Sequence, residues 1–303
     1  MAGSGPPDDT GPGATAADQR RNAPCHVLHD HHGLTMPQTI LLTGAAGGVG
    51  SMLRHLLPAF DHRLRCADLV AVPNEPDALV FDLRDADAVR EAVRGVDAVV
   101  HLGGISQEDT FQAILGANIE GAYHVYEAVR QEGVPRVVFA SSNHAVGFTP
   151  LEGRGPGGAG LIGTAIPPRP DTYYGLSKVF GEGLAQLYAD KYGVTTVSVR
   201  IGSCFPRPTT TRMLSTWLSP ADCARLVHAA LTAPVTGHVV VNGISANTRG
   251  WWDLAPARAL GYEPRDDAEE YAAEIIAEHG ELPPDGVDAR LLGGPFTGIE
   301  PPR

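Results

Sequence analysis

The sequence predicts an α/β protein: a doubly wound, parallel sheet of Rossmann type with a small C-terminal substrate lobe. From residue 39 onward, short runs of apolar and β-branched residues alternate with longer amphipathic stretches. This alternation is typical of a parallel sheet that is covered by helices on both faces. A Gly-rich turn follows the first strand and an acid ends the second, as in doubly wound folds that bind a ligand at their strand ends.

Strands and long helices account for most of this pattern. One helix is expected directly after the Gly-rich turn, ending near residue 57, and others at residues 87–94, 110–132 and 171–191. The strands are expected at residues 40–42, 65–68, 79–81, 98–102, 136–141, 195–200 and 238–241. Since the carboxyl ends of parallel strands meet at one edge of the sheet, functional residues are expected at that edge.

Three regions are expected along the chain. Residues 1–37 are rich in Gly, Pro, Asp and Ala and lack hydrophobic periodicity, so they predict a disordered tail. His29–His32 in this tail offers metal ligands, but a solvated His-rich tail is favoured because no fixed geometry holds them. Residues 38–200 are expected to form the Rossmann core. Residues 201–303 contain the last strand and Pro- and Trp-punctuated segments, and are expected to complete the sheet and form the lobe.

The composition argues against several classes of function. The formal net charge is −12 and aromatic residues make up 6%, so no nucleic-acid partner is expected. The 4 cysteines are scattered without a CxxC pair, which argues against a metal site and a disulfide framework and fits a reducing cytoplasm. No apolar run approaches the roughly 18–20 residues of a membrane span, so no membrane partner is expected.

The Gly-rich turn predicts a dinucleotide site. Thr43–Gly50 reads TGAAGGVG between a strand and a helix, where small residues let the backbone approach a pyrophosphate at the helix N-terminus. Asp68 ends the next strand, where its carboxylate can accept from ribose hydroxyls and repel a 2'-phosphate. No Arg or Lys follows it closely, so NAD is expected rather than NADP. Asp82 ends the third strand, either as an adenine contact or as a helix N-cap.

A Tyr and a Lys predict proton transfer next to this site. Tyr174 and Lys178 are four residues apart on a predicted helix and share one face. A neighbouring ammonium favours the phenolate and lowers the phenol pKa, so the pair can take a proton from a hydroxyl while hydride leaves the carbon. The chain has only one other Lys, Lys191, which makes a surface i, i+4 pair the weaker interpretation. The expected NAD contacts are Gly44, Gly47, Gly48, Val49, Gly50, Asp68, Leu69, Asp82, Leu83, Leu102, Gly103, Gly104, Asn118, Tyr174 and Lys178.

These motifs resemble the extended short-chain dehydrogenase/reductase superfamily, and longer blocks resemble its uronate dehydrogenase family. The similar blocks are residues 100–106 (VHLGGIS), 141–144 (SSNH), 200–204 (RIGSC), 212–217 (RMLSTW) and 251–253 (WWD). The resemblance spans about residue 36 to the C-terminal region. It implies an oxidoreductase that acts on a CH–OH group and uses NAD to oxidise D-glucuronate or D-galacturonate at C1 to the aldarolactone.

The resemblance also implies residue roles. Tyr174 would be the base, Lys178 its activator, and Ser142 would orient the anomeric hydroxyl. Arg212 would bind the sugar carboxylate through its fork of donors, and Phe296 would close over the site. The implied substrate contacts are Ser106, Ser142, Asn143, His144, Ser203, Arg212 and Phe296. The chain departs from the family at Gly48, where a Gln is common, and in a longer, Gly-rich loop at residues 151–166.

Two other functions share parts of this pattern. A nucleotide-sugar epimerase or dehydratase would need a larger C-terminal lobe than residues 243–303 offer, and a dehydratase would need acids where Asn143 and His144 stand. A non-catalytic NAD-binding sensor could lose the Tyr–Lys pair, which is present here. By analogy with related enzymes, we expect a cytoplasmic homo-oligomer that pairs through the helices after strands four and five.

Overall fold

The computed structural model describes residues 38–151, 153–154 and 160–302. The predicted tail (residues 1–37), with its His29–His32 run, lies outside the described residues, and so does part of the predicted loop at 151–166. Within the described part of the chain, no helix is both long and apolar enough to cross a membrane.

A seven-stranded parallel sheet forms the centre of the fold and confirms the predicted fold class. Its strands are β1 (Thr39–Thr43), β2 (Arg63–Asp68), β3 (Leu79–Val80), β4 (Ala98–His101), β5 (Arg136–Ser142), β6 (Thr195–Ile201) and β9 (His238–Gly243). Their order across the sheet is β3-β2-β1-β4-β5-β6-β9, and every pair is parallel. The chain runs outward from β1 in one direction and returns to β4 on its other side. The gap between the ends of β1 and β4 is therefore the switch point at which such sheets bind ligands.

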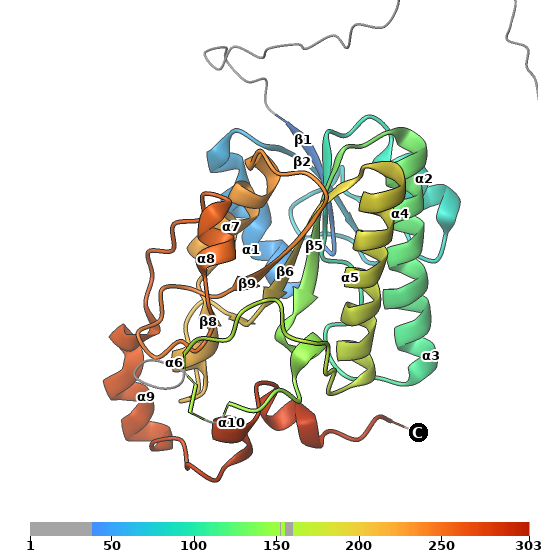
Figure 1. The fold of residues 1–303 in the computed structure, drawn as a ribbon. Helices are drawn as coiled ribbons and strands as arrows, with labels where there is room; N and C mark the ends of the chain where they lie inside the picture. Colours follow the sequence, from blue (N-terminus) through green and yellow to red (C-terminus); the bar gives the residue numbers. More distant parts are fainter. Residues whose placement is uncertain (1–37, 152, 155–159, 303) are drawn as a thin grey trace, which may run out of the picture. The chain divides into compact units, whose positions relative to one another are not determined.

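Helices cover both faces of this sheet. They are α1 (Gly48–Leu56), α2 (Ala86–Val93), α3 (Phe111–Ile114), α4 (Gly121–Glu132), α5 (Tyr173–Tyr192), α6 (Met213–Thr216), α7 (Pro220–Thr232), α8 (Ala255–Ala259), α9 (Ala272–His279) and α10 (Val287–Arg290). In Figure 1, α1, α7 and α8 lie on one face, and α2, α4 and α5 lie on the other. Side chains alternate along β1 accordingly: Ile40 and Leu42 join the first core cluster, and Leu41 joins the second.

Two helical regions that pack on the sheet differ from the sequence prediction, and the short helices α6, α8, α9 and α10 were not predicted. The single helix expected over 110–132 is divided into α3, a π-helical turn (η2, Leu115–Glu120) and α4. The wider turn contains Asn118, whose side chain makes contacts outside the helix, and π turns of this kind are common at functional sites. Helix α7 was not expected at all; it begins at Pro220 after the N-cap Ser219 and packs on the sheet.

The rest of the chain builds smaller units beyond the carboxyl ends of β5, β6 and β9. Short strands β7 (Ser203–Cys204) and β8 (Trp217–Leu218) pair in parallel. One apolar cluster consists of Val146, Leu151, Ile162, Ile244, Trp251, Trp252 and Leu292, and a second of Leu214, Trp217, Ala268, Ala272 and Ile275. The first cluster joins segments from before α5 and from the C-terminal region. The predicted boundary at residue 200 stays a prediction.

Candidate active site

One cavity of about 940 Å³ opens at the carboxyl edge of the sheet. Its walls come from the ends of β1, β2, β4, β5 and β6, from the start of α5, and from the C-terminal segment near Phe296. Every residue that the sequence assigned to cofactor, substrate or catalysis lines this cavity, except Asn118. The fold therefore brings predicted site residues from Gly44 to Phe296 together around this cavity.

The Gly-rich turn is shaped by close backbone approaches. Gly44 has φ +71, and a Cβ on it would lie 2.8 Å from the backbone nitrogen of Gly103. A Cβ on Gly50 would overlap the carbonyl oxygen of Gly44. Gly48, in contrast, has no heavy atom within 4 Å of where a Cβ would stand. Gly44 and Gly50 are thus required by the turn itself, whereas Gly48 faces open space.

The start of α1 fits the phosphates of a dinucleotide. Its N-cap, Gly47, has no side chain to bond the first helical N–H groups, and no acid stands in the first turn. The free N–H groups and the positive end of the helix dipole therefore face the cavity. Val49 and the Gly103–Gly104 pair line the same part of the wall.

Two carboxylates, Asp68 at the end of β2 and Asp82 just after β3, line the part of the cavity beside the Gly-rich turn Gly44–Gly50, here called the cradle. Asp68 accepts a hydrogen bond from the backbone N–H of Ala46 at 2.9 Å, so it fixes the Gly-rich turn while lining the cavity. Asp82 is bonded to Arg84, whose guanidinium holds the pKa of that carboxyl below its usual value. The N-cap of α2 is Asp85, which accepts from Ala88. The N-cap interpretation of Asp82 is therefore wrong, since Asp85, nearer the helix, takes that place. Leu69, Leu83 and Leu102 also line this part of the cavity.

Asn118 lies behind the cavity wall. Its side-chain oxygen accepts from the Ile105 N–H at 2.8 Å, and its amide donates to the Ile105 carbonyl at 2.9 Å and to Ser177 Oγ at 3.0 Å. These bonds hold the loop after β4 against α5. The amide and carbonyl of Asn118 are satisfied by the protein, so the side chain positions the wall.

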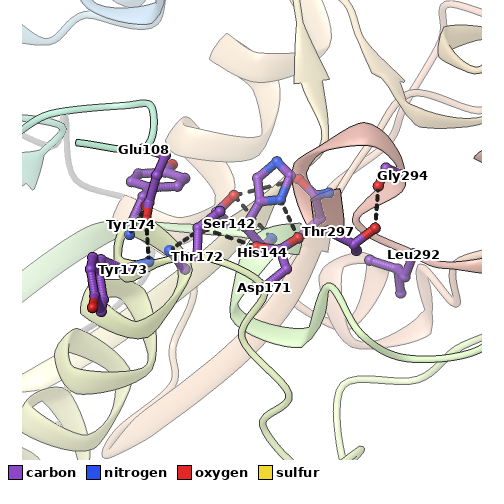
Figure 2. A network of polar contacts seen from close by, with 12 residues as sticks. Glu108, Ser142, His144, Asp171, Thr172, Tyr173, Tyr174, Leu292, Gly294 and Thr297 are labelled. Carbon is purple, nitrogen blue, oxygen red and sulfur yellow. Dashed lines mark hydrogen bonds and ion pairs between the residues drawn. The ribbon is translucent and has the colours of Figure 1, made fainter. Parts of the chain in front are cut away.

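The N-terminus of α5 is held by two side chains. Thr172 caps it by accepting from the Gly175 N–H at 2.9 Å. The Glu108 carboxylate accepts from the N–H groups of Tyr173 and Tyr174 at 3.0 and 2.9 Å (Figure 2). Sequence reasoning missed Glu108, because only the fold brings the loop after β4 to this helix end. A carboxylate here also complements the helix dipole.

Tyr174 and Lys178 share one face of α5, as predicted. The Lys178 Nζ lies 5.3 Å from the centroid of the Tyr174 ring and 5.3 Å from that of Phe139. Tyr173 points away and packs edge-on against Phe111.

Burial dominates the protonation of this pair. It raises the pKa of Tyr174; a hydrogen bond with Ser142 lowers it and the Asp171 charge raises it further. Burial also lowers the pKa of Lys178 to about 8. The predicted lowering of the Tyr174 pKa is therefore wrong for this structure, in which burial of the phenol raises that pKa.

The end of β5 forms the next part of the wall. Ser142 Oγ accepts from the His144 N–H at 3.2 Å and donates to Asn143 Oδ1 at 3.4 Å. The His144 ring stacks on Phe296, with centroids 4.0 Å apart. Its Nδ1 lies 2.7 Å from Asp171 Oδ2, a residue that sequence reasoning did not single out. The signal available was its place two residues before Tyr173, at the expected start of the helix.

Arg212 supplies a largely buried cation to the wall of the cavity. Its Nη1 donates to the Asp288 carbonyl at 3.2 Å and its Nη2 to the Leu292 carbonyl, and its guanidinium lies 5.4 Å from the Trp251 ring centroid. Burial lowers the pKa of Arg212 to about 10, while the charges of Asp288 and Asp171 raise it. The guanidinium therefore stays charged at neutral pH.

Ser106 and Ser203 complete the predicted set of residues that line the cavity. Ser203 Oγ lies 2.8 Å from Thr216 Oγ1, which ties it to α6. Ser106 is exposed at the cavity mouth, in the loop after β4.

Fold and site together define a class of protein. A parallel Rossmann sheet with a phosphate cradle at its switch point and a buried Tyr–Lys pair in the same cavity is that of a nicotinamide-dependent oxidoreductase of short-chain dehydrogenase type.

Comparison with known proteins narrows this class. Residues 40–222 match the NAD dependent epimerase/dehydratase family. The uronate dehydrogenase of Pseudomonas syringae pv. tomato is 47% identical over 267 residues, which cover 86% of this chain and 94% of that protein. The chain therefore belongs to the NAD-dependent epimerase/dehydratase family and, within it, to the uronate dehydrogenases.

Solved structures agree with this assignment. The structure of glucuronic acid dehydrogenase from Chromohalobacter salexigens superposes with a TM-score of 0.81 at 45% identity, covering 88% of this chain and 98% of that one. A mutant uronate dehydrogenase from Agrobacterium tumefaciens, complexed with NAD, superposes with a TM-score of 0.80 at 44% identity, covering 87% and 98%. The predicted family and the predicted cofactor, NAD, are both confirmed.

Proposed function

We propose that this protein oxidises a hexuronate, D-glucuronate or D-galacturonate, at C1 with NAD and forms the aldarolactone. The observation that carries the proposal is the largely buried Arg212 cation in the same cavity as Tyr174 and Lys178. In a chain with a net charge of −12, a buried local cation is what a carboxylate substrate requires.

The cradle Gly44–Gly50 and Asp68 would hold NAD, which accepts a hydride from C1 when bound. The free N–H groups of α1 would bind its pyrophosphate, and Asp68 would accept from ribose hydroxyls. Gly103 and Gly104 leave the wall after β4 without side chains, which lets the cofactor lie close. The Asp68 carboxylate would repel a 2'-phosphate, so NAD is preferred over NADP.

Tyr174 would take the proton from the C1 hydroxyl at its phenolate oxygen. Ser142 contacts the phenol and would orient that hydroxyl toward it. Lys178 lies beside the phenol, and its ammonium charge would favour the phenolate against the cost of burial. Asn118 and Glu108 would keep the base in place, because they fix the wall and the start of its helix.

Arg212 would bind the C6 carboxylate of the sugar. Two of its five N–H groups are bonded to carbonyls of the C-terminal segment, and its Nε lies 3.7 Å from Asp288 Oδ1. The second N–H of each terminal nitrogen would bind the substrate carboxylate. Carboxylate binding would thus also depend on the segment that carries Phe296. The remaining sugar contacts would be Ser106, Asn143, His144, Ser203 and Phe296.

The test is reduced-cofactor formation, followed by absorbance, with glucuronate, galacturonate, glucose and a UDP-sugar, each with NAD and with NADP. Turnover of the uronates with NAD, and little turnover of glucose, is the expected result. Activity on the nucleotide sugar alone would move the chain to the epimerase and dehydratase chemistry of its superfamily. Binding of NAD with no turnover of any sugar would favour a sensor.

We also propose that the protein is a cytoplasmic homo-oligomer. Large apolar side chains are exposed along the helical region that includes α4 and α5, which supports self-association there. They are Phe111, Leu115, Tyr123, Tyr173, Leu176, Phe180, Leu187 and Tyr192. The free, buried cysteines Cys66, Cys204 and Cys223 fit a reducing compartment. Sedimentation velocity tests the assembly: a dimer or larger is expected, and a monomer at all concentrations would contradict it.

A further inference from the structure

Asp171 is a buried carboxylate that the proposed chemistry does not use. It stands just before α5, and its side chain has an exposed fraction of 0%. The part of the chain that the structure describes provides no Arg or Lys partner for it within 4.0 Å. A buried carboxylate without a cationic side chain is costly, so its hydrogen bonds need a reason.

Both carboxylate oxygens of Asp171 are bonded to neighbours that hold the wall of the cavity. Oδ2 lies 2.7 Å from Nδ1 of His144, and Oδ1 accepts from the Thr172 hydroxyl at 3.0 Å (Figure 2). Thr172 in turn caps the helix that carries Tyr174. The backbones of Asp171 and His144 are also linked, because the Asp171 N–H donates to the His144 carbonyl at 3.4 Å.

Two glycines make room for this carboxylate. A Cβ on Gly147 or on Gly293 would overlap Asp171 Oδ2. The N–H of Gly293 donates to the Gly147 carbonyl at 2.8 Å. Because both glycines adjoin Asp171 Oδ2, the C-terminal segment packs directly against the Asp171 carboxylate. That segment continues to Phe296, whose ring stacks on His144. Three segments distant in sequence thus meet at one side chain.

The carboxylate determines which nitrogen of His144 carries the proton. An ionised carboxylate only accepts, so the His144 Nδ1 must be the donor. In the neutral imidazole, Nε2 then carries a lone pair. Nε2 has no hydrogen-bond partner among the described residues, and His144 lines the cavity. A lone pair at that place would accept from a sugar hydroxyl.

We propose that Asp171 is a positioning residue for the sugar: it fixes the ring plane and the tautomer of His144, so that Nε2 accepts from a substrate hydroxyl. The same carboxylate contacts the segment whose Phe296 ring stacks on the face of that imidazole. This inference rests on the proposed function, because it assigns the sugar to this end of the cavity.

The first test is Asp171→Asn, which keeps the size of the side chain but can donate to Nδ1 and reverse the tautomer. The KM for the hexuronate is expected to rise about tenfold or more, because a buried hydrogen bond to the sugar is lost. The Kd for NAD, measured by fluorescence titration, is expected to stay within about twofold, because the cradle is untouched. An unchanged KM in a folded variant would overturn the proposal.

Asp222→Asn is the matched control. Asp222 is equally buried, with an exposed fraction of 0%, but it pairs with Arg225 on α7 away from the cavity. The same substitution there is expected to lower the melting temperature and leave the KM unchanged. If both variants raised the KM alike, the effect of Asp171 would be general destabilisation, and the proposal would fail.

A double-mutant cycle tests whether Asp171 acts through His144. In a His144→Ala background, Asp171→Asn is expected to change the KM by less than about twofold, since its target is gone. A tenfold rise in that background would show an independent role and overturn the proposal.

A measurement on the wild-type protein does not depend on the folding of any variant. The ¹⁵N shifts of the His144 ring, assigned by their loss in His144→Gln, are expected to show the proton on Nδ1 in the neutral form. A proton on Nε2 instead would overturn the proposal. Absence of hexuronate turnover by the wild-type enzyme would refute the proposed function and not the His144–Asp171 geometry, so the two failures are distinguishable.

Discussion

The two halves of the cavity are built in different ways. In the half proposed to hold NAD, the cofactor half at the ends of β1, β2 and β4, the wall includes a Gly-rich turn, a glycine pair and a helix N-terminus. The other half, proposed to hold the sugar, is the sugar half. In the sugar half, at the ends of β5 and β6, the wall is made of side chains joined by buried polar bonds, such as His144 to Asp171. Arg212 is held there by carbonyls of the C-terminal segment.

Specificity for the cofactor and specificity for the sugar therefore have different structural origins. A dinucleotide is bound by shape and by the N–H groups of one short segment, so a few small residues encode its site. A particular sugar requires oriented donors and acceptors, and these are fixed by partners far away in the sequence. Substitutions should therefore separate cofactor binding from sugar chemistry.

The largest effect is expected from the loss of the base. Tyr174→Phe should lower kcat by about a thousandfold or more, because the proton acceptor is removed while the ring remains. NAD binding, measured by fluorescence titration, should change by less than about threefold. A variant that kept a tenth of the wild-type kcat would show that another group takes the proton.

A paired substitution tests the backbone character of the cofactor half. Gly50→Ala should lower the free energy of unfolding by about 3 kcal/mol and weaken NAD binding, because the new Cβ meets the backbone of Gly44 and Ala45. Gly48→Ala should be neutral or stabilise by up to about 1 kcal/mol, because its Cβ meets open space in a helix. Denaturant titration and NAD titration of both variants check this. Equal effects at the two positions would contradict the described turn.

One buried ionisable group also lies beneath the cofactor half. Burial and the Lys178 charge lower the pKa of His101 to about 3. In the unfolded chain His101 binds a proton below about pH 6.5, whereas in the folded protein it stays neutral down to about pH 3. Protonation therefore favours the unfolded chain, so the free energy of unfolding is highest above pH 6.5 and decreases as the pH falls. Between pH 7 and pH 5 the loss from His101 is about 2 kcal/mol.

His101→Gln should remove that part of the acid sensitivity. Its free energy of unfolding, measured by urea titration at pH 7, 6 and 5, should fall less steeply than that of the wild type. Identical slopes would mean that His101 takes up no proton on unfolding in this range.

A smaller effect is expected at the ribose end of the cradle. Asp68→Asn should weaken NAD binding about tenfold, because a charge-assisted acceptor for the ribose hydroxyls is lost. Discrimination against NADP should relax, since the charge that repels a 2'-phosphate is gone. The ratio of kcat/KM for NAD and NADP measures this, and an unchanged ratio would show that another group selects the cofactor.

The same contrast explains what the sequence could predict. The sheet, most helices and the cofactor cradle follow from local patterns: apolar runs, a Gly-rich turn and an acid at a strand end. The Tyr–Lys pair follows from helical spacing, and the positions of the sugar contacts were implied by family resemblance. All of the predicted cofactor, catalytic and substrate residues except Asn118 line the cavity of about 940 Å³.

What the sequence did not reveal depends on contacts between distant segments. Asp171 and Glu108 act through the backbone and side chains of other elements. The local sequence places Asp171 only at the expected start of a helix, and it gives no signal for Glu108. The contact of Asn118 with the cofactor stays a prediction, and what the sequence does not reveal is that its amide bonds to Ile105 and Ser177 from a π turn. The raised pKa of Tyr174 likewise reflects its burial in the folded protein, which spacing alone does not give.

The central claim is that the sugar half recognises a carboxylate through Arg212. The most direct measurement is kcat/KM for glucuronate and for glucose in the wild type, in Arg212→Ala and in Arg212→Lys. If Arg212 binds the carboxylate, the preference for glucuronate falls about a hundredfold in Arg212→Ala, Arg212→Lys lies in between, and NAD binding changes little. An undiminished preference for glucuronate in Arg212→Ala would contradict it.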